Sequence, residues 1–223
     1  MAIDFYYGSG SPYAWRVQLA LEAKGLPYER RLLSFSAGDT VKPEFVALNP
    51  RHRVPVIVDA GFVLYESNAI VEYLDEAYPT HGLKLFPGDA RQRAVVRRIV
   101  SEVDGYTDDA TEPVIDEVIY AKPEARSAER LAAARERAAG EFAFLARYLG
   151  GEWLAGPLSA ADFALYPIVA FMDRCHQRDP SFDAESLFTA RARRVEAPDR
   201  VAALPRHDPP AALARVLTPR SPR

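Results

Sequence analysis

The feature that most limits the fold of this chain is a change in hydrophobic pattern near residue 80. Before that point, short apolar runs bounded by turn residues predict strands at residues 3–7, 28–33, 54–59 and 62–65. A helix that ends near Gly25 follows the first strand, and a second helix, which Ser67 can cap and Tyr78 closes, follows the last. The order strand, helix, strand, loop, strand, strand, helix predicts a four-stranded mixed sheet covered by helices.

After residue 80 the chain carries only helical periodicity. Apolar residues recur at helical spacing over residues 92–120 and again over residues 131–149, which predicts two long antiparallel helices. Turn residues at 86–89 mark a junction just before the first of them. The chain therefore reads as a small α/β unit followed by an all-helical unit.

These patterns divide the chain into three parts. We expect an α/β domain at residues 1–80 and an all-helical domain at residues 88–204. Residues 205–223 contain five prolines and four arginines without a usable apolar face, so we expect a loosely ordered tail there.

A further helix in the second domain has a marked start. Ser159 is followed three residues later by Asp162, the spacing of a capping box. In such a box the serine hydroxyl accepts from the amide of the third helical residue, and the acid reaches back to the cap. Leu158 and Phe163 are spaced as a hydrophobic staple, so the helix should start at a defined angle inside the core.

Charge and cysteine content narrow the possible partners. The chain has 28 basic and 31 acidic residues and a net charge of -3, which gives no global field to attract a polyanion, so we expect no nucleic-acid partner. No apolar stretch reaches about 18 residues and the start does not resemble a secretory signal, so we expect a cytoplasmic protein without a membrane partner. The single cysteine, Cys175, excludes an intrachain disulfide.

Common cofactor motifs are not matched. Gly8 and Gly10 have the spacing that opens a dinucleotide fingerprint, but the third glycine would fall at position 13, which is Tyr13. The four histidines are too scattered in sequence to suggest a metal cluster. We therefore expect neither a dinucleotide nor a metal.

Three other segments, together with the capping box, point to one family. They are Ser11-Pro12-Tyr13-Ala14-Trp15-Arg16-Val17, Asn49-Pro50 to Val54-Pro55-Val56-Ile57, and Glu66-Ser67-Asn68-Ala69-Ile70. In this order and at these distances they resemble the cytosolic glutathione transferase family, serine type. The resemblance implies a thioredoxin-like α/β N-terminal domain and an all-α C-terminal helical domain. Ser-x-x-x-Trp-Arg-Val resembles zeta-type members and Ser-Pro-Tyr resembles tau-type members, so the subclass stays open.

The resemblance also implies how glutathione would be held as cosubstrate. Ser67 and the first amides of its helix would form an anion site for the γ-glutamyl carboxylate, and Glu66 would take the ammonium. A cis proline at Pro55 would turn the backbone of Val54 outward to pair with the cysteinyl peptide like an added strand. Arg53 would contact the glycyl end as a cation.

Ser11 is the candidate catalytic residue, as a hydrogen-bond donor to the glutathione sulfur. A free cysteine thiol has a pKa of about 8.5, and lowering it by about two units needs about 2.7 kcal/mol of anion stabilisation. Two charge-assisted hydrogen bonds and a helix N-terminus are of that size, so no base is required. Ser9 is the rival hydroxyl, and in isolation Ser11 followed by proline would be read only as a helix cap.

The expected function is a glutathione transferase that conjugates the thiolate to an apolar electrophile. The alternatives are a glutathione-dependent isomerase or dehalogenase, and a glutathione-binding module without turnover. Tyr13, Tyr106 and Phe171 can line an apolar substrate pocket between the domains, or can belong to the core. Because the resembled family is commonly dimeric, we expect a homodimer.

Overall fold

The computed structural model describes residues 2–149 and 153–178. The chain divides into two compact units, residues 1–96 and residues 97–223, and each unit is described by itself. The expected tail at residues 205–223 lies outside the described residues.

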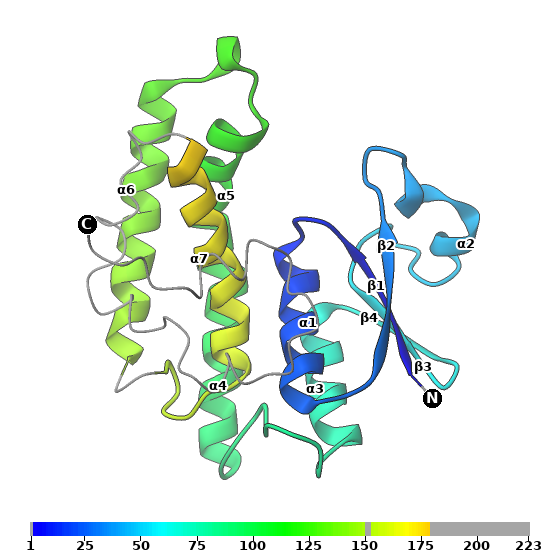
Figure 1. Cartoon of the computed structure of the whole chain (residues 1–223). Helices are drawn as coiled ribbons and strands as arrows, with labels where there is room; N and C mark the ends of the chain where they lie inside the picture. The colour runs from blue at the N-terminus through cyan, green and yellow to red at the C-terminus, as the bar shows by residue number, and fades with distance from the viewer. Residues whose placement is uncertain (1, 150–152, 179–223) are drawn as a thin grey trace, which may run out of the picture. The chain divides into compact units, whose positions relative to one another are not determined.

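The first unit is built on a four-stranded mixed sheet (Figure 1). Its strands are β1 (Ile3–Gly8), β2 (Tyr28–Leu33), β3 (Val56–Asp59) and β4 (Phe62–Tyr65), in the order β2-β1-β3-β4. β2 runs parallel to β1, whereas β3 is antiparallel to both β1 and β4. The predicted mixed sheet is confirmed, but the third strand begins at Val56 and not at residue 54.

Two helices lie against the sheet of the first unit. They are α1 (Pro12–Lys24) and α3 (Ser67–Ala77), which pack on each other. Their apolar side chains are almost fully removed from water, including Val17 and Leu21 of α1 and Ile70 and Leu74 of α3. α1 ends as predicted at Gly25, whose left-handed φ of 63° glycine adopts without strain. Burial of these side chains holds both helices in the core of the unit.

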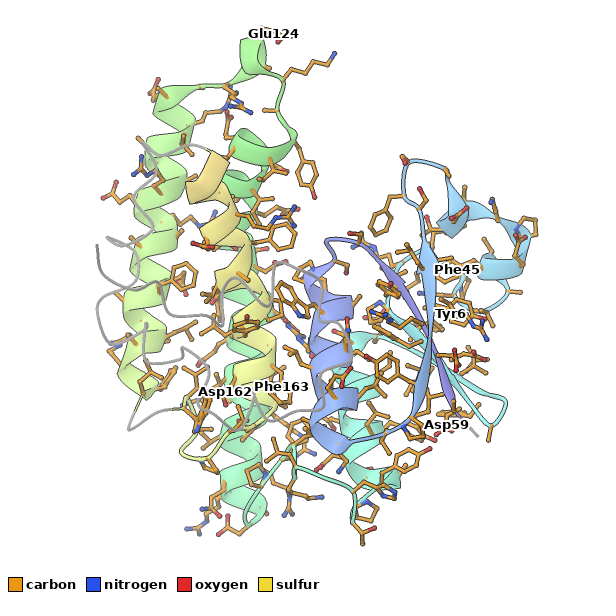
Figure 2. All side chains as sticks on the ribbon, in the orientation of Figure 1. Tyr6, Phe45, Asp59, Glu124, Asp162 and Phe163 are labelled. Carbon is orange, nitrogen blue, oxygen red and sulfur yellow. The ribbon has the colours of Figure 1, made fainter. Side chains whose placement is uncertain are left out.

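Short local signals account for the connections. Ala60 and Gly61, between β3 and β4, have φ values of 49° and 87°, as a tight type I′ hairpin turn requires. The loop after β2 contains the 3₁₀ turn η1 (Asp39–Val41) and the short helix α2 (Pro43–Val46). α2 was not predicted because four residues are too few to show helical periodicity. Phe45 of α2 is buried beside Tyr6 of β1, with ring centroids 6.2 Å apart (Figure 2).

Asp59 ties α3 to the hairpin at the end of β3. The hydroxyls of Tyr73 and Tyr78 donate to its Oδ2 at 2.7 and 2.5 Å. Burial, followed by the hydrogen bond to Asp59, raises the pKa of Tyr73 to about 12, so this phenol remains a donor at neutral pH. The C-terminal half of α3 is thus held at the hairpin that follows β3.

Asp75 fixes the segment after α3. Its buried carboxylate accepts from the backbone amides of Leu85 at 2.8 Å and Phe86 at 3.3 Å, and it pairs with Lys24 and Lys84. Burial by itself would raise the pKa of Asp75, but the Leu85 amide and the two lysines outweigh it and hold the pKa below its ordinary value. A single carboxylate therefore satisfies donors from α1 and from the segment after α3.

Over its described residues, the regular elements of the second unit are helices, and Trp153 and Gly156 form an isolated β-bridge. The first helical run consists of α4 (Ala90–Glu102), the π-helical η2 (Val103–Thr107), α5 (Asp108–Ile115) and the π-helical η3 (Asp116–Tyr120). The boundary between the two units falls within α4. After η4 (Pro123–Ala125) come α6 (Ala128–Leu145), η5 (Ala146–Tyr148) and α7 (Ala160–Arg178). α5 packs against α6 and α7, and α6 returns in the opposite direction (Figure 1). The predicted pair of antiparallel helices is confirmed, but the two π-helical segments were not predicted.

The start of α7 forms the predicted capping structure with one difference. Asp162 accepts from the amides of Ser159 at 2.9 Å and Leu154 at 3.0 Å. The hydroxyl of Ser159 donates to the same carboxylate at 3.2 Å, whereas we expected it to accept from a backbone amide. The amide of Asp162 is taken instead by the carbonyl of Ser159 at 3.1 Å. Asp162 and the buried Phe163 stand side by side at the first turn (Figure 2).

Burial decides the acidity of this carboxyl group. Removal from water raises the pKa of Asp162 to about 6, although the amides of Leu154 and Ser159 and the Ser159 hydroxyl oppose the shift. The hydrogen bonds stabilise the charged form, but they only partly replace the lost hydration.

Candidate functional site

Ser11 forms the N-cap of α1. Its backbone is extended, with φ -76° and ψ 117°, and its Oγ accepts from the amide of Ala14 at 3.2 Å, with Pro12 at the first helical position. Its own amide donates to the carbonyl of Gly8 at 3.2 Å. Because the cap uses a lone pair of the hydroxyl oxygen, the hydroxyl proton remains available for donation to another group.

The loop from β1 to α1 separates the two candidate hydroxyls. Ser9 is exposed in the turn, whereas Ser11 is half-buried at the helix N-terminus. Gly8 is covered by the ring of Phe35, and a Cβ at Gly8 would lie only 2.2 Å from Cζ of that ring. Glycine at position 8 permits this close approach of the Phe35 ring. The carbonyl of Gly8, which accepts from the Ser11 amide, is thereby held in place. The helix terminus favours Ser11 over Ser9 as a donor to an anion.

The segment before β3 contains the expected cis peptide bond between Val54 and Pro55. Pro55 is buried, Val54 is half-buried and Arg53 is exposed. Val54 precedes the registered pairs of β3, which begin at Val56, so its backbone lies outside the ladder of the sheet. An extended peptide can pair with such a backbone by strand addition.

Asn49 holds this segment, and sequence reasoning gave it no role. Its side chain is 2% exposed, its Nδ2 donates to the carbonyl of Arg53 at 2.7 Å, and its Oδ1 accepts from the amide of Arg51 at 3.0 Å. Asparagine before proline is typical of a turn whose side chain bonds to nearby backbone, and that signal could have identified it. Asn49 therefore fixes the chain immediately before Val54.

The start of α3 differs from the expectation. Ser67 was predicted to cap the helix, but it is the first helical residue, and the cap position is held by Glu66, whose side chain makes no capping bond. Glu66 is exposed and has φ 72° and ψ 112°, which a non-glycine residue adopts only at an energetic cost. The Ser67 hydroxyl is buried and accepts from Nη1 of Arg16 at 3.3 Å. Ser67 lies inside the helix and not at its cap because the chain turns at Glu66, directly after β4.

Arg16 is the second residue whose role sequence reasoning missed. It lies on the buried face of α1 and is 2% exposed, and its Nη1 also donates to Oδ1 of Asn68. Its Cζ stands 5.3 Å from the centre of the Tyr13 ring. The available signal was a charged residue inside an otherwise apolar helical face.

The sheet register brings the three predicted segments to one end of the sheet. Val56, the first residue of β3, pairs with Tyr6 near the end of β1 and with Tyr65 at the end of β4. The loop that carries Ser11 follows β1, the Val54-Pro55 bond precedes β3, and Glu66 follows β4. These strand ends lie side by side in the sheet. The donors of the Ser11 loop, the free backbone of Val54 and the carboxylate of Glu66 therefore lie at the same end of it.

The predicted pocket residues have different environments. Tyr13 is half-buried in α1 of the first unit. In the second unit Tyr106 lies in η2 with 64% of its side chain exposed, whereas Phe171 in α7 is 5% exposed. Their assignment to a substrate pocket stays a prediction.

The described residues offer no metal site and no membrane span. They contain no group of three or more histidine, cysteine or acidic side chains placed to hold a metal ion. Within the same residues, every helix is too short or too polar to span a bilayer.

Family models match both parts of the chain. The model described as glutathione S-transferase, N-terminal domain, matches residues 10–77, and the model described as glutathione S-transferase, C-terminal domain, matches residues 128–206. The chain belongs to the glutathione transferase family of enzymes. The expected fold class, a thioredoxin-like domain followed by a helical domain, is confirmed.

Individual relatives agree with this membership. The chain is similar to glutathione S-transferase D7 of Drosophila melanogaster, with 38% identity over 96 residues, which is 43% of this chain and 43% of that protein. Among solved structures, a glutathione S-transferase from the Antarctic clam Laternula elliptica is 28% identical with a TM-score of 0.72, covering 97% of this chain and 100% of that one. A glutathione transferase from Pseudomonas putida with one bound glutathione disulfide per subunit is 25% identical with a TM-score of 0.75, covering 93% and 92%.

Proposed function

We propose that the protein conjugates the thiolate of glutathione to an apolar electrophilic small molecule. The observation that carries the proposal is the meeting of Ser11, Val54-Pro55 and Glu66-Ser67 at one end of the sheet. Glutathione has a thiol, peptide groups, an amine and two carboxylates, and each of these segments has the chemistry to receive one part of it. The solved relative with bound glutathione disulfide supports the choice of ligand.

In this proposal the sulfur is placed at the N-terminus of α1. The Ser11 hydroxyl, whose oxygen already accepts from Ala14, donates its proton in a hydrogen bond to the thiolate. The positive end of the helix dipole adds to that stabilisation. Lowering the thiol pKa by about two units from about 8.5 makes roughly three quarters of the bound thiol ionised at neutral pH. Serine at this position forms no mixed disulfide, so sulfur transfer to an electrophile is favoured over thiol exchange.

The remaining segments hold the rest of the ligand. Ser67 and the first amides of α3 receive the γ-glutamyl carboxylate, and Glu66 pairs with the neighbouring ammonium. The backbone of Val54 pairs with the cysteinyl peptide, and the exposed Arg53 contacts the glycyl carboxylate. We further expect that the protein is cytoplasmic and acts in detoxification. We also expect a homodimer, and light scattering measures this oligomeric state.

Two measurements test the proposal. Calorimetric titration with glutathione is the first, because failure of the wild-type protein to bind would exclude the transferase and its isomerase alternative together. The second is the thiol pKa of bound glutathione, followed by thiolate absorbance against pH in wild type and Ser11→Ala. We expect a pKa lowered by about two units in the wild type and mostly restored by the substitution. A thiol pKa that is not lowered, with binding intact, would favour a glutathione-binding module without turnover.

A further inference from the structure

Arg16 connects the two helices that carry the proposed anion contacts. It lies on α1, five residues after Ser11, and is 2% exposed. Its Nη1 donates to Ser67 Oγ at 3.3 Å and to Asn68 Oδ1, and both acceptors belong to the first turn of α3. A buried guanidinium therefore contacts the first turn of α3.

The first turn of α3 is a favourable place for an anion. The N-terminus of an α-helix carries a partial positive charge, so acids stabilise that end and cations do not. The first turn of α3 contains no acidic residue, and the Glu66 side chain makes no capping bond. Arg16 contributes a hydrogen-bonded cation to this end of α3. An anion bound there would interact favourably with both.

The contact with Ser67 also sets the direction of its hydroxyl proton. Because Ser67 Oγ accepts from Arg16, its proton is directed away from Arg16 and can be donated to a ligand. A cation on the accepting side polarises the hydroxyl and strengthens the bond that it donates. Ser11, at the proposed position of the thiolate, has the same arrangement, because its hydroxyl oxygen accepts from the amide of Ala14.

We propose that Arg16 is a positioning residue for the γ-glutamyl carboxylate of glutathione. It orients the Ser67 hydroxyl as a donor at the carboxylate site and adds a cation to the first turn of α3. The inference rests on the proposed function, and it identifies the residue that makes the first turn of α3 selective for an anion.

The test compares two ligands on several variants. The ligands are glutathione and an analogue in which 4-aminobutyryl replaces the γ-glutamyl group, which removes the carboxylate and keeps the amine. Arg16→Gln removes the charge and keeps hydrogen-bonding capacity, and Arg16→Lys keeps the charge. Lys24→Met is the matched control, because Lys24 is a buried cation on the same helix that pairs with Asp75. Calorimetry measures affinity, and thiolate absorbance measures the pKa of the bound thiol.

We expect Arg16→Gln to weaken glutathione binding about tenfold or more while changing binding of the analogue less than about threefold. Arg16→Lys should recover part of the loss, Lys24→Met should not discriminate between the ligands, and the bound thiol pKa should stay lowered in all three variants. In the Ser67→Ala background the effect of Arg16→Gln should shrink, because the two act through one contact.

Other results would overturn the inference. Equal loss of both ligands in Arg16→Gln would make Arg16 a structural clamp, as would the same discrimination in Lys24→Met. If Arg16→Gln does not fold, Ser67→Ala and Arg16→Lys decide, since equal loss of both ligands in Ser67→Ala also overturns it. Failure of the wild type to bind glutathione would be distinguishable, because it removes the proposed function before any variant is compared.

Discussion

The Oγ of Ser11 accepts a hydrogen bond from the backbone amide of Ala14 at 3.2 Å, so one hydroxyl both starts α1 and faces the proposed thiolate position. The two roles use different parts of the group, the oxygen lone pair for the helix and the proton for the ligand. They can therefore be separated by substitution.

Ser11→Asp should keep the cap and lose catalysis. Because aspartate is a good N-cap, the free energy of unfolding of the Ser11→Asp protein should stay within about 0.5 kcal/mol of the wild-type value. The Ser11→Ala protein should lose about 1 kcal/mol. Both should lower kcat/KM about 100-fold, because neither side chain at neutral pH donates a hydrogen bond to the thiolate. Urea denaturation and conjugation assays measure the two effects. Wild-type turnover by Ser11→Asp would contradict the donor role, and Ser11→Thr, which keeps the hydroxyl, should remain active.

Glu66 should show a conflict between stability and binding. Its φ of 72° is unfavourable for any residue with a Cβ, so Glu66→Gly should raise the free energy of unfolding by about 1 kcal/mol. Glu66→Ala keeps the strain and removes the carboxylate, so it should not gain this stability. Both variants should bind glutathione about tenfold more weakly through loss of the ammonium contact. Thermal unfolding and calorimetry check the pair, and unchanged glutathione affinity in both would remove Glu66 from the site.

Asn49 should couple the stability of the loop to glutathione binding. Asn49→Ala leaves the carbonyl of Arg53 and the amide of Arg51 without their partner, which should cost about 1–3 kcal/mol. Glutathione binding should weaken as well, because the backbone of Val54 loses its fixed position. Asn49→Asp keeps the acceptor for Arg51 but sets a buried carboxylate oxygen against the carbonyl of Arg53, so it should damage binding and cost at least as much stability as alanine. A stable Asn49→Ala protein with wild-type affinity would contradict this assignment.

Asp162 should make stability fall as pH rises. Its folded pKa of about 6 lies above its ordinary 3.8, so the folded state binds the proton more tightly than the unfolded state. The contribution is therefore fully present below pH 3.8 and is lost as pH rises to about 6, by roughly 3 kcal/mol in total. Urea denaturation from pH 4 to 7 should show this slope in wild type relative to Asp162→Asn.

Asp75 provides the control of opposite sign. Its folded pKa lies below its ordinary value, so its contribution to stability is present above the unfolded pKa and is lost as the pH falls through the folded pKa. Relative to Asp75→Asn, wild-type stability should therefore rise with pH in the acidic range. Equal slopes in the two comparisons would contradict the opposite effects of burial and charge at these carboxylates.

Local patterns explain why much of the fold could be predicted. The hairpin at Ala60-Gly61 and the acid of the capping box at Asp162 depend on residues within a few positions, so sequence alone identifies them. The apolar periodicity of α1 and α6 likewise reports which face is buried. The four-residue α2 and the π-helical η2 and η3 escaped prediction because no repeat of sufficient length marks them.

The sequence by itself determined the order of elements, the turn chemistry and the residue types available for binding an anion and a thiolate. Only the tertiary structure decided which of them act together. Arg16 and Ser67 are 51 positions apart, and their contact exists because α1 and α3 pack on each other. Packing placed Ser67 inside the helix instead of at its cap and moved the turn to Glu66. The apolar periodicity of the sequence shows which face of one helix or strand is buried. A contact between two elements depends on how they pack on each other, which this periodicity does not show.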